Sequence, residues 1–342
     1  MSQKTNKPSL EQWKRLYELM GEIRRLAPWE FMYEQDIFGI RFPTTDRLGF
    51  VSVMGNLGEH LAIAVYLGKK GFEGFLTMQN MGYDLTADIV LQVPQLQASL
   101  EDREMITPED RKIINKLNLK FRGRQAWPQF RSYRPACFPW YLEEEEAQML
   151  IHGLEQLLDV APRFKSEPDL LETSEHDGKY LVRVQEDGKW VDRYETIKFP
   201  ADPPLELRMN LDALNQLKHM PKRNSIIEVD IQMMEGAIND EESERPFFPF
   251  LLMMVDKQSS MILGADLLSP LPSLEAMWED IPAAVVTILA NYLLPKEIQT
   301  KAALIALLLS PLEKELGIKV KLVSRLPALE SAQQELRKFT RR

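Results

Sequence analysis

The feature that most constrains this chain is the order of elements across residues 224–340, where apolar patterning marks three strands and then alternating helices and strands. Residues 225–233 predict a strand that is apolar on both faces, as a central strand should be. Residues 247–268 predict a long hairpin that turns at residues 256–260. A helix joining two strands of one sheet favours parallel pairing, so we expect a mixed sheet with helices on both faces.

This order resembles the core of ribonuclease H-like integrases and transposases, which implies a C-terminal βββαβαβα domain. In that family, acidic side chains on the first strand, after the fourth strand and on a late helix bind two Mg²⁺ ions that cleave phosphodiester bonds. Asp230 matches the first position, and Glu330 or Glu335 matches the last. The middle position falls at Thr300-Lys301, where a lysine would repel metal ions instead of supplying an oxygen ligand.

The missing acid favours a scaffold without nuclease activity, so we expect a non-enzymatic binding or interaction role. The alternative is a metal-dependent phosphodiester-cleaving enzyme that uses Asp230 with Glu330 or Glu335. Fold alone does not decide between them, because one fold supports many functions.

The N-terminal half predicts an α+β domain with antiparallel strands over residues 1–162. Its first helix is expected over residues 10–26, because Ser9 and Gln12 form a capping-box pattern ahead of an amphipathic stretch. Three strand candidates then follow, separated by turn residues. We expect residues 163–222 to form a linker with a β-hairpin and a short helix, and residues 223–342 to form the C-terminal domain.

Short motifs in both halves are similar to those of an uncharacterised bacterial family whose members carry an N-terminal domain of unknown function and often a second, C-terminal one. The motifs are Pro28-Trp29-Glu30, Val53-Met54-Gly55, Gly58-Glu59-His60 and Arg245-Pro246-Phe247-Phe248-Pro249. The resemblance brings no activity, substrate or cofactor. Gly55 and Gly58 are expected to serve a tight turn, since glycine adopts positive φ without strain.

One basic and aromatic stretch is a candidate surface for a ligand or nucleic acid. Its candidate ligand-binding residues are Arg122, Arg124, Trp127, Arg131 and Arg134. Aromatic rings stack on bases, and arginines contact phosphates. The same arginines would equally pair with the acidic run at residues 143–146, with the rings packed inward. A net charge of −9 argues against a general nucleic-acid binder, so nucleic-acid binding is the second alternative.

The composition excludes several kinds of site. One cysteine leaves no disulfide framework and no zinc site built from several thiolates, and the four histidines are too dispersed for a metal site. We expect no cofactor and no membrane association, since the apolar runs are shorter than the ~20 residues of a membrane span. A bacterial cytoplasmic protein is expected, with another protein as a candidate partner.

Overall fold

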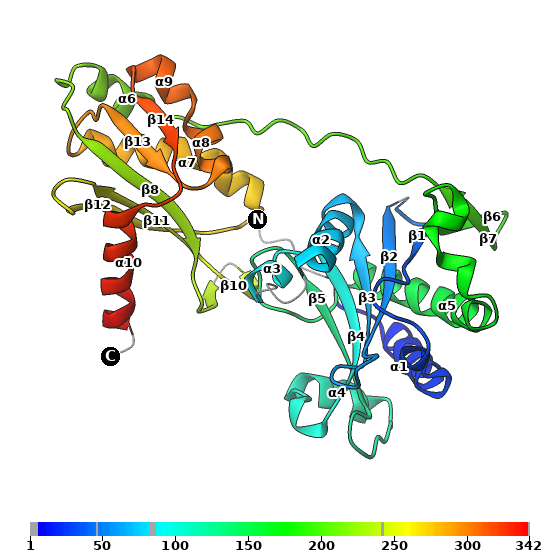
Figure 1. Ribbon diagram of the computed structural model, residues 1–342. Coiled ribbons are helices and arrows are strands. Elements are labelled where there is room, and N and C mark those ends of the chain that lie inside the picture. Colours follow the sequence, from blue (N-terminus) through cyan, green and yellow to red (C-terminus); the bar gives the residue numbers. More distant parts are fainter. Residues whose placement is uncertain (1–5, 46, 82–86, 241–242, 341–342) are drawn as a thin grey trace. The chain divides into compact units, whose positions relative to one another are not determined.

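The chain folds into two compact units, Met1–Pro200 and Ala201–Arg342, in a computed structural model that describes residues 6–45, 47–81, 87–240 and 243–340. Each unit contains a β-sheet with helices packed against it (Figure 1). The expected mixed α+β class is therefore confirmed. Among the described residues, no helix is both long enough and apolar enough to cross a bilayer.

The N-terminal unit is built on a seven-stranded sheet with the order β5-β4-β3-β2-β1-β6-β7. The strands are β1 (Phe38–Arg41), β2 (Leu48–Met54), β3 (Ala62–Leu67), β4 (Gln95–Glu101), β5 (Trp127–Tyr133), β6 (Tyr180–Glu186) and β7 (Lys189–Glu195). Neighbouring strands run antiparallel, as expected, except that β1 and β6 pair in parallel through Gly39 and Val182.

Helices cover both faces of this sheet (Figure 1). On one face α1 (Leu10–Leu26) packs beside α5 (Glu144–Ser166), and on the other lies α2 (Gly68–Met81). The capping box of Ser9 and Gln12 starts α1, so that prediction is confirmed. The shorter elements are η1 (Pro28–Glu30), α3 (Ala87–Val90), η3 (Arg103–Met105), α4 (Pro108–Lys116), η4 (Pro168–Leu171) and η5 (Thr173–His176).

The β6–β7 hairpin belongs to the N-terminal sheet, which corrects the expected linker over residues 163–222. Strand β6 hydrogen-bonds to β1, and buried Arg183 on β6 donates to Gln156 of α5. Helix α5 also continues past residue 162, and α6 (Leu211–Lys218) joins the core of the C-terminal unit. The predicted hairpin is present. Four consecutive residues of β6 are buried, so this strand is covered on both faces and does not lie in a solvent-exposed linker.

The C-terminal unit contains a five-stranded sheet with the order β12-β11-β8-β13-β14. Its strands are β8 (Ile226–Met233), β11 (Phe250–Asp256), β12 (Ile262–Leu268), β13 (Glu297–Thr300) and β14 (Lys319–Leu322). The first three strands pair antiparallel, and β13 pairs in parallel with both β8 and β14, so the expected element order and parallel pairing are confirmed. A small separate hairpin, β9 (Ile238–Asp240) with β10 (Ser243–Phe247), is inserted after β8.

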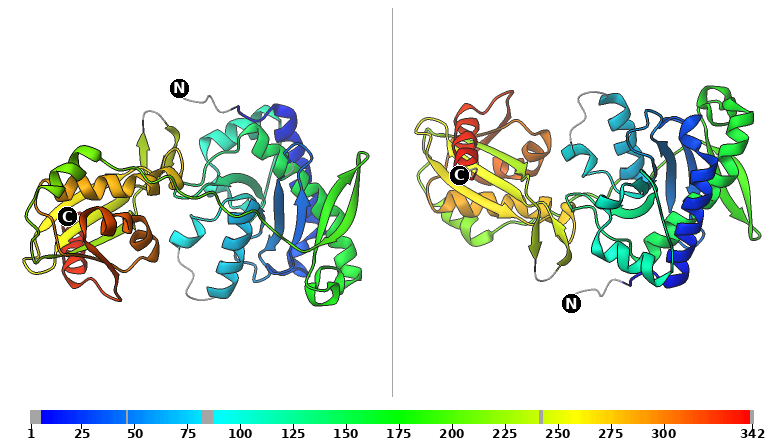
Figure 2. Two further views of the ribbon diagram at one scale, coloured as in Figure 1. Left: turned by 90° about the horizontal axis from the view of Figure 1, so that it is seen from above. Right: turned by 90° about the horizontal axis from the view of Figure 1, so that it is seen from below.

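Two different layers cover this sheet. One apolar layer combines α6 with α7 (Leu274–Ala290), α8 (Ala303–Leu309) and α9 (Pro311–Leu316). The opposite face carries α10 (Pro327–Thr340), drawn in red in Figure 2. Helices α8 and α9 are separated at Ser310 because Pro311 cannot donate a backbone hydrogen bond.

Candidate functional site

A cavity of about 920 Å³ opens in the C-terminal unit at the carboxyl ends of the parallel strands β8, β13 and β14. Its polar lining, which defines the carboxyl-end cavity, is Asp230, Gln232, Lys301, Ser324, Glu330, Gln333 and Gln334. Ligands of open α/β sheets bind where neighbouring strands lead in opposite directions along the sheet. From β8 the chain continues to β11 on one side, and from β13 it continues to β14 on the other. The cavity therefore lies at the place where such sheets bind ligands.

The acid that matches the first metal-ligand position is paired with the lysine of the middle position. The Nζ atom of Lys301 lies 3.2 Å from Oδ2 of Asp230. Asp230 is only 4% exposed, whereas the Lys301 side chain is 42% exposed at the cavity. The structure thus brings together the two residues that the sequence singled out.

The two late-helix candidates lie in different places on α10. Glu330 lines the carboxyl-end cavity, where Arg325 lies 3.6 Å from its carboxylate. Glu335 is exposed, is outside the cavity lining and pairs with Lys338 at 2.7 Å. Only Glu330 therefore shares a cavity with Asp230. Within the described ranges, no three histidine, cysteine, aspartate or glutamate side chains are grouped so that they would hold a metal ion.

Asp230 is one of four buried carboxylates on the described strands of this sheet, and all but Asp256 at the end of β11 have a lysine partner. This carboxylate–lysine row consists of Glu228 with Lys257 at 3.7 Å, Asp230 with Lys301 at 3.2 Å, and Glu297 with Lys321 at 2.7 Å. Sequence reasoning missed Glu228 and Glu297. The available signal was an acid two residues before Asp230, since alternate residues of a strand face the same side.

Glu228 fixes the start of α10. Its side chain is fully buried, and Oε2 accepts a hydrogen bond of 2.9 Å from the backbone N–H of Leu329 in the first turn of that helix. The other oxygen, Oε1, has no hydrogen-bond partner among the described residues. Because Glu330, Gln333 and Gln334 lie on the same helix, the Glu228 carboxylate also positions one wall of the cavity.

Glu297 occupies a charge-stabilising environment. Burial would raise the pKa of its carboxyl group, but hydrogen bonds from Lys321 and Gln299, together with the charges of Lys321 and Lys296, hold that pKa below its usual value. The ionised form is therefore the one that the folded sheet favours.

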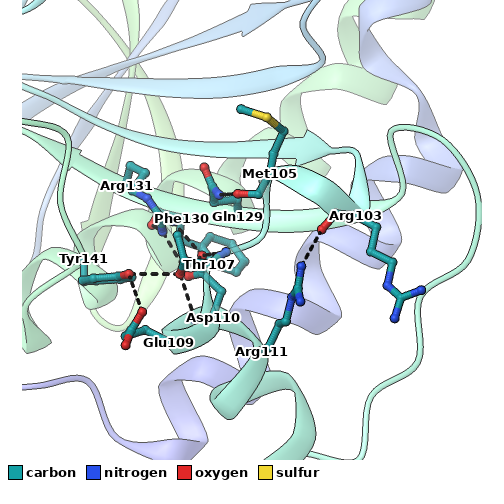
Figure 3. A network of polar contacts seen from close by, with 10 residues as sticks. All are labelled: Arg103, Met105, Thr107, Glu109, Asp110, Arg111, Gln129, Phe130, Arg131 and Tyr141. Carbon is teal, nitrogen blue, oxygen red and sulfur yellow. Dashed lines mark hydrogen bonds and ion pairs between the residues drawn. The ribbon is translucent and has the colours of Figure 1, made fainter.

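The basic and aromatic candidates of the N-terminal unit divide into paired and exposed residues. Arg131 makes two parallel hydrogen bonds to Asp110, of 3.0 and 2.6 Å, and its guanidinium lies 4.8 Å from the centre of the Tyr141 ring. Figure 3 shows this group, in which Thr107 contacts both Asp110 and Tyr141. Arg131 therefore ties β5 to the start of α4.

Arg134 is likewise bound, since its Nη2 atom lies 2.5 Å from Glu143 and 2.9 Å from Glu146. This is the pairing with the acidic run that the sequence left open. Trp127 is half-buried and packs edge-on against Phe121 at 5.7 Å. Arg122 and Arg124 are exposed. The five candidates therefore do not form one free surface.

Two family models match the chain. A domain of unknown function (DUF7309) matches residues 13–183, and a second domain of unknown function (DUF6930) matches residues 213–337. No curated protein matches the chain. Each match lies within one of the two compact units, so the resemblance to an uncharacterised two-domain family is confirmed.

Proposed function

Because the chain belongs to the family of the domain of unknown function DUF7309, which brings no activity with it, we propose a function from the carboxyl-end cavity: a non-enzymatic binding protein. The C-terminal unit would use a ribonuclease H-like core as a scaffold that holds a ligand in this cavity. The strand order β12-β11-β8-β13-β14, with antiparallel and then parallel pairing, supports that core. We further propose a bacterial cytoplasmic setting, which a single cysteine fits.

The observation that carries the proposal is the 3.2 Å contact between Lys301 and Asp230. The lysine ammonium neutralises the carboxylate and occupies a position from which a divalent cation would be repelled. A metal ion would have to displace this tethered charge before it reached Asp230. The cavity lining instead offers amides and a hydroxyl, which suit recognition by hydrogen bonds.

The alternative function is metal-dependent phosphodiester cleavage. It is supported by one observation, since Asp230 and Glu330 line the same cavity. Two-metal hydrolases hold their ions between such carboxylates. Glu335, outside the cavity lining, is not needed for this alternative.

Nucleic-acid binding through the five basic and aromatic candidates, the second alternative, has weaker support. Arg131 and Arg134 already have carboxylate partners, and removing them from those partners would leave acids without a counter-charge. The surface formed by all five candidates is therefore not part of this proposal.

The substitution Lys301→Asp tests the proposal by exchanging the tethered cation for an acid. We expect no change in the wild-type melting temperature with millimolar Mg²⁺ or Mn²⁺, and a metal-dependent rise for the variant, because only a metal-binding folded state is stabilised by mass action. Differential scanning fluorimetry measures both. A matched control, Lys301→Asp combined with Asp230→Asn, should lose the gain.

A cleavage assay with a phosphodiester substrate distinguishes the enzymatic alternative from the binding proposal. If the wild-type protein cleaves in the presence of metal and Asp230→Asn abolishes the cleavage, the protein is an enzyme and the binding proposal is wrong. If Lys301→Ala cleaves no substrate in the presence of metal, and added metal does not change its melting temperature, the scaffold interpretation is retained.

A further inference from the structure

A run of positive charge lies on the second half of α4 and the loop that follows it. Residues 111–124 contain six lysines and arginines and no acid, in a chain whose net charge is −9. All six side chains are exposed: Arg111, Lys112, Lys116, Lys120, Arg122 and Arg124. We call this surface the basic lobe.

Few acids neutralise the basic lobe. Lys112 lies 3.6 Å from Glu109 and is 72% exposed, and Arg124 lies 4.0 Å from Asp102 and is 87% exposed. Exposed pairs of this length contribute little to stability and exchange readily for another partner. Across the described residues, the side chains of Lys116, Lys120 and Arg122 make no hydrogen bond or ion pair. The lobe therefore presents charges that are available to a partner.

The backbone beneath these charges is held in place. The Thr107–Asp110 capping box starts α4, and the backbone N–H of Gln125 donates to Asp102 at 2.7 Å where the loop ends. Between these points, the ring of Phe121 stacks on Tyr17 at 5.7 Å. Phe121 thus anchors the loop while its neighbours on either side remain exposed. Because the backbone is already held in place, binding here loses less backbone conformational freedom than binding to an unanchored loop would.

The lobe offers charge without exposed apolar side chains. Its apolar residues are buried or half-buried: Ile113, Ile114, Leu117, Leu119 and Phe121. A protein partner needs apolar or aromatic anchors at the centre of its interface, and a membrane needs apolar residues to insert. A phosphodiester backbone needs neither, because lysines and arginines on its phosphates release counterions.

We propose that the basic lobe binds the phosphate backbone of a nucleic acid without reading its bases. Arginine forks and lysine ammonium groups contact phosphate oxygens directly. The proposal does not depend on the carboxyl-end cavity, which belongs to the other unit. It shares Arg122 and Arg124 with the basic and aromatic surface predicted from the sequence, but it replaces Trp127, Arg131 and Arg134 with cations of α4 and Lys120 and uses no aromatic stacking.

Fluorescence anisotropy with the full-length protein tests this proposal. The probes are a labelled RNA strand and a labelled DNA duplex of about 20 nucleotides or base pairs, longer than the ~4–16 nucleotides that a small binding module covers. The test variant is Lys116→Glu with Lys120→Glu. The matched control, Lys14→Glu with Lys189→Glu, makes the same charge change at exposed sites elsewhere in the N-terminal unit.

We expect wild-type binding that weakens steeply between about 50 and 200 mM salt, with a log–log slope of up to about −5 for six phosphate contacts on duplex DNA. The test variant should bind at least about tenfold more weakly, with the slope reduced by about 2. The control should keep the wild-type slope. Unchanged melting temperatures would show that both variants fold.

Several results would overturn the proposal. One is the absence of saturable wild-type binding at the lower salt concentration, and another is equal loss in the test and control variants. Binding of polyglutamate or of phosphatidylserine vesicles as tightly as nucleic acid would assign the lobe to another polyanion. Because Lys301→Asp leaves the lobe intact, this variant should bind nucleic acid like the wild type. Loss of nucleic-acid binding in this variant would indicate that the site is the carboxyl-end cavity and not the lobe.

Discussion

The two units use buried carboxylates in different ways. In the N-terminal unit, Arg131 clamps Asp110 with two hydrogen bonds, and its side chain is 11% exposed. In the C-terminal unit, Lys301 reaches Asp230 with one ammonium group from a side chain that is 42% exposed. A guanidinium fork fixes position, whereas a lysine is a flexible point charge that can leave. The first arrangement suits architecture, and the second suits a site whose occupant can change.

The largest expected effect is at the clamp. Asp110→Ala removes both carboxylate oxygens that accept from Arg131 and the capping acid of α4, and leaves a nearly buried guanidinium without its counter-charge. We expect the free energy of unfolding to fall by about 3–5 kcal/mol. Urea unfolding followed by tryptophan fluorescence measures this change. The neighbouring exposed acid serves as control, since Glu109→Ala should cost about 0.5 kcal/mol or less.

A loss below about 1 kcal/mol for Asp110→Ala would mean that the clamp is no firmer than a surface pair, and the contrast between the two units would disappear.

The next effect concerns the attachment of α10. Glu228→Ala deprives the Leu329 N–H of its acceptor, which should cost about 1–3 kcal/mol. Hydrogen exchange at the Leu329 amide should become faster. Glu228→Gln keeps an oxygen acceptor in the same place and should cost less. Equal effects of the two substitutions would show that charge, and not the hydrogen bond, holds the helix.

A smaller effect is expected for the outermost pair of the carboxylate–lysine row. The pKa of Glu297 is lowered in the folded state, so the unfolded chain binds more protons there, and the stabilisation is present at neutral pH and lost as pH falls below about 4.5. Lys321→Met should make stability less dependent on pH in this range. At neutral pH it should cost less than about 1 kcal/mol, because Lys321 is half exposed.

Chemical denaturation at a series of pH values measures this dependence. Lys319→Met, an exposed neighbour on the same strand, is the control and should leave the profile unchanged. A steeper dependence in Lys321→Met would contradict the lowered pKa of Glu297.

The smallest effect on stability is expected at an exposed ion pair of α10. Lys338 and Glu335 form a helical pair in which both side chains are more than 60% exposed. Lys338→Ala should change the free energy of unfolding by no more than about 0.5 kcal/mol, measured by urea unfolding. A larger loss would show that the exposed part of α10 has a partner in solution.

Local patterns predicted much of this fold. The Ser9 cap and the order of elements along residues 224–340 follow from neighbouring residues or a short register. Contacts between residues that are distant in sequence could not be predicted in this way. The hairpin pattern of β6 and β7 carries no information about β1, to which β6 pairs.

The candidate site was predicted only in part, for the same reason. Glu228 lies within the apolar strand β8 and Glu297 is the first residue of the short strand β13, and their lysine partners come from a turn and from another strand. The partners of Arg131 are set by the way α4 packs on β5. The sequence pattern identified which charged residues were candidates for the site. Their burial in the folded chain decides which of them remain accessible to a ligand, and spacing does not reveal it.

The parallel pairing of β1 with β6 has a consequence for how the chain is made and divided. Gly39 meets Val182, so the N-terminal sheet stays incomplete until the ribosome has released more than half of the chain. Such non-local pairing slows folding. A fragment that ends at residue 162 would leave β1 with an unpaired edge, which promotes aggregation. One that ends with the DUF7309 match at residue 183 would keep the two residues that pair with β1 but would cut β6 short and remove β7. An expressed N-terminal domain should therefore extend to residue 200.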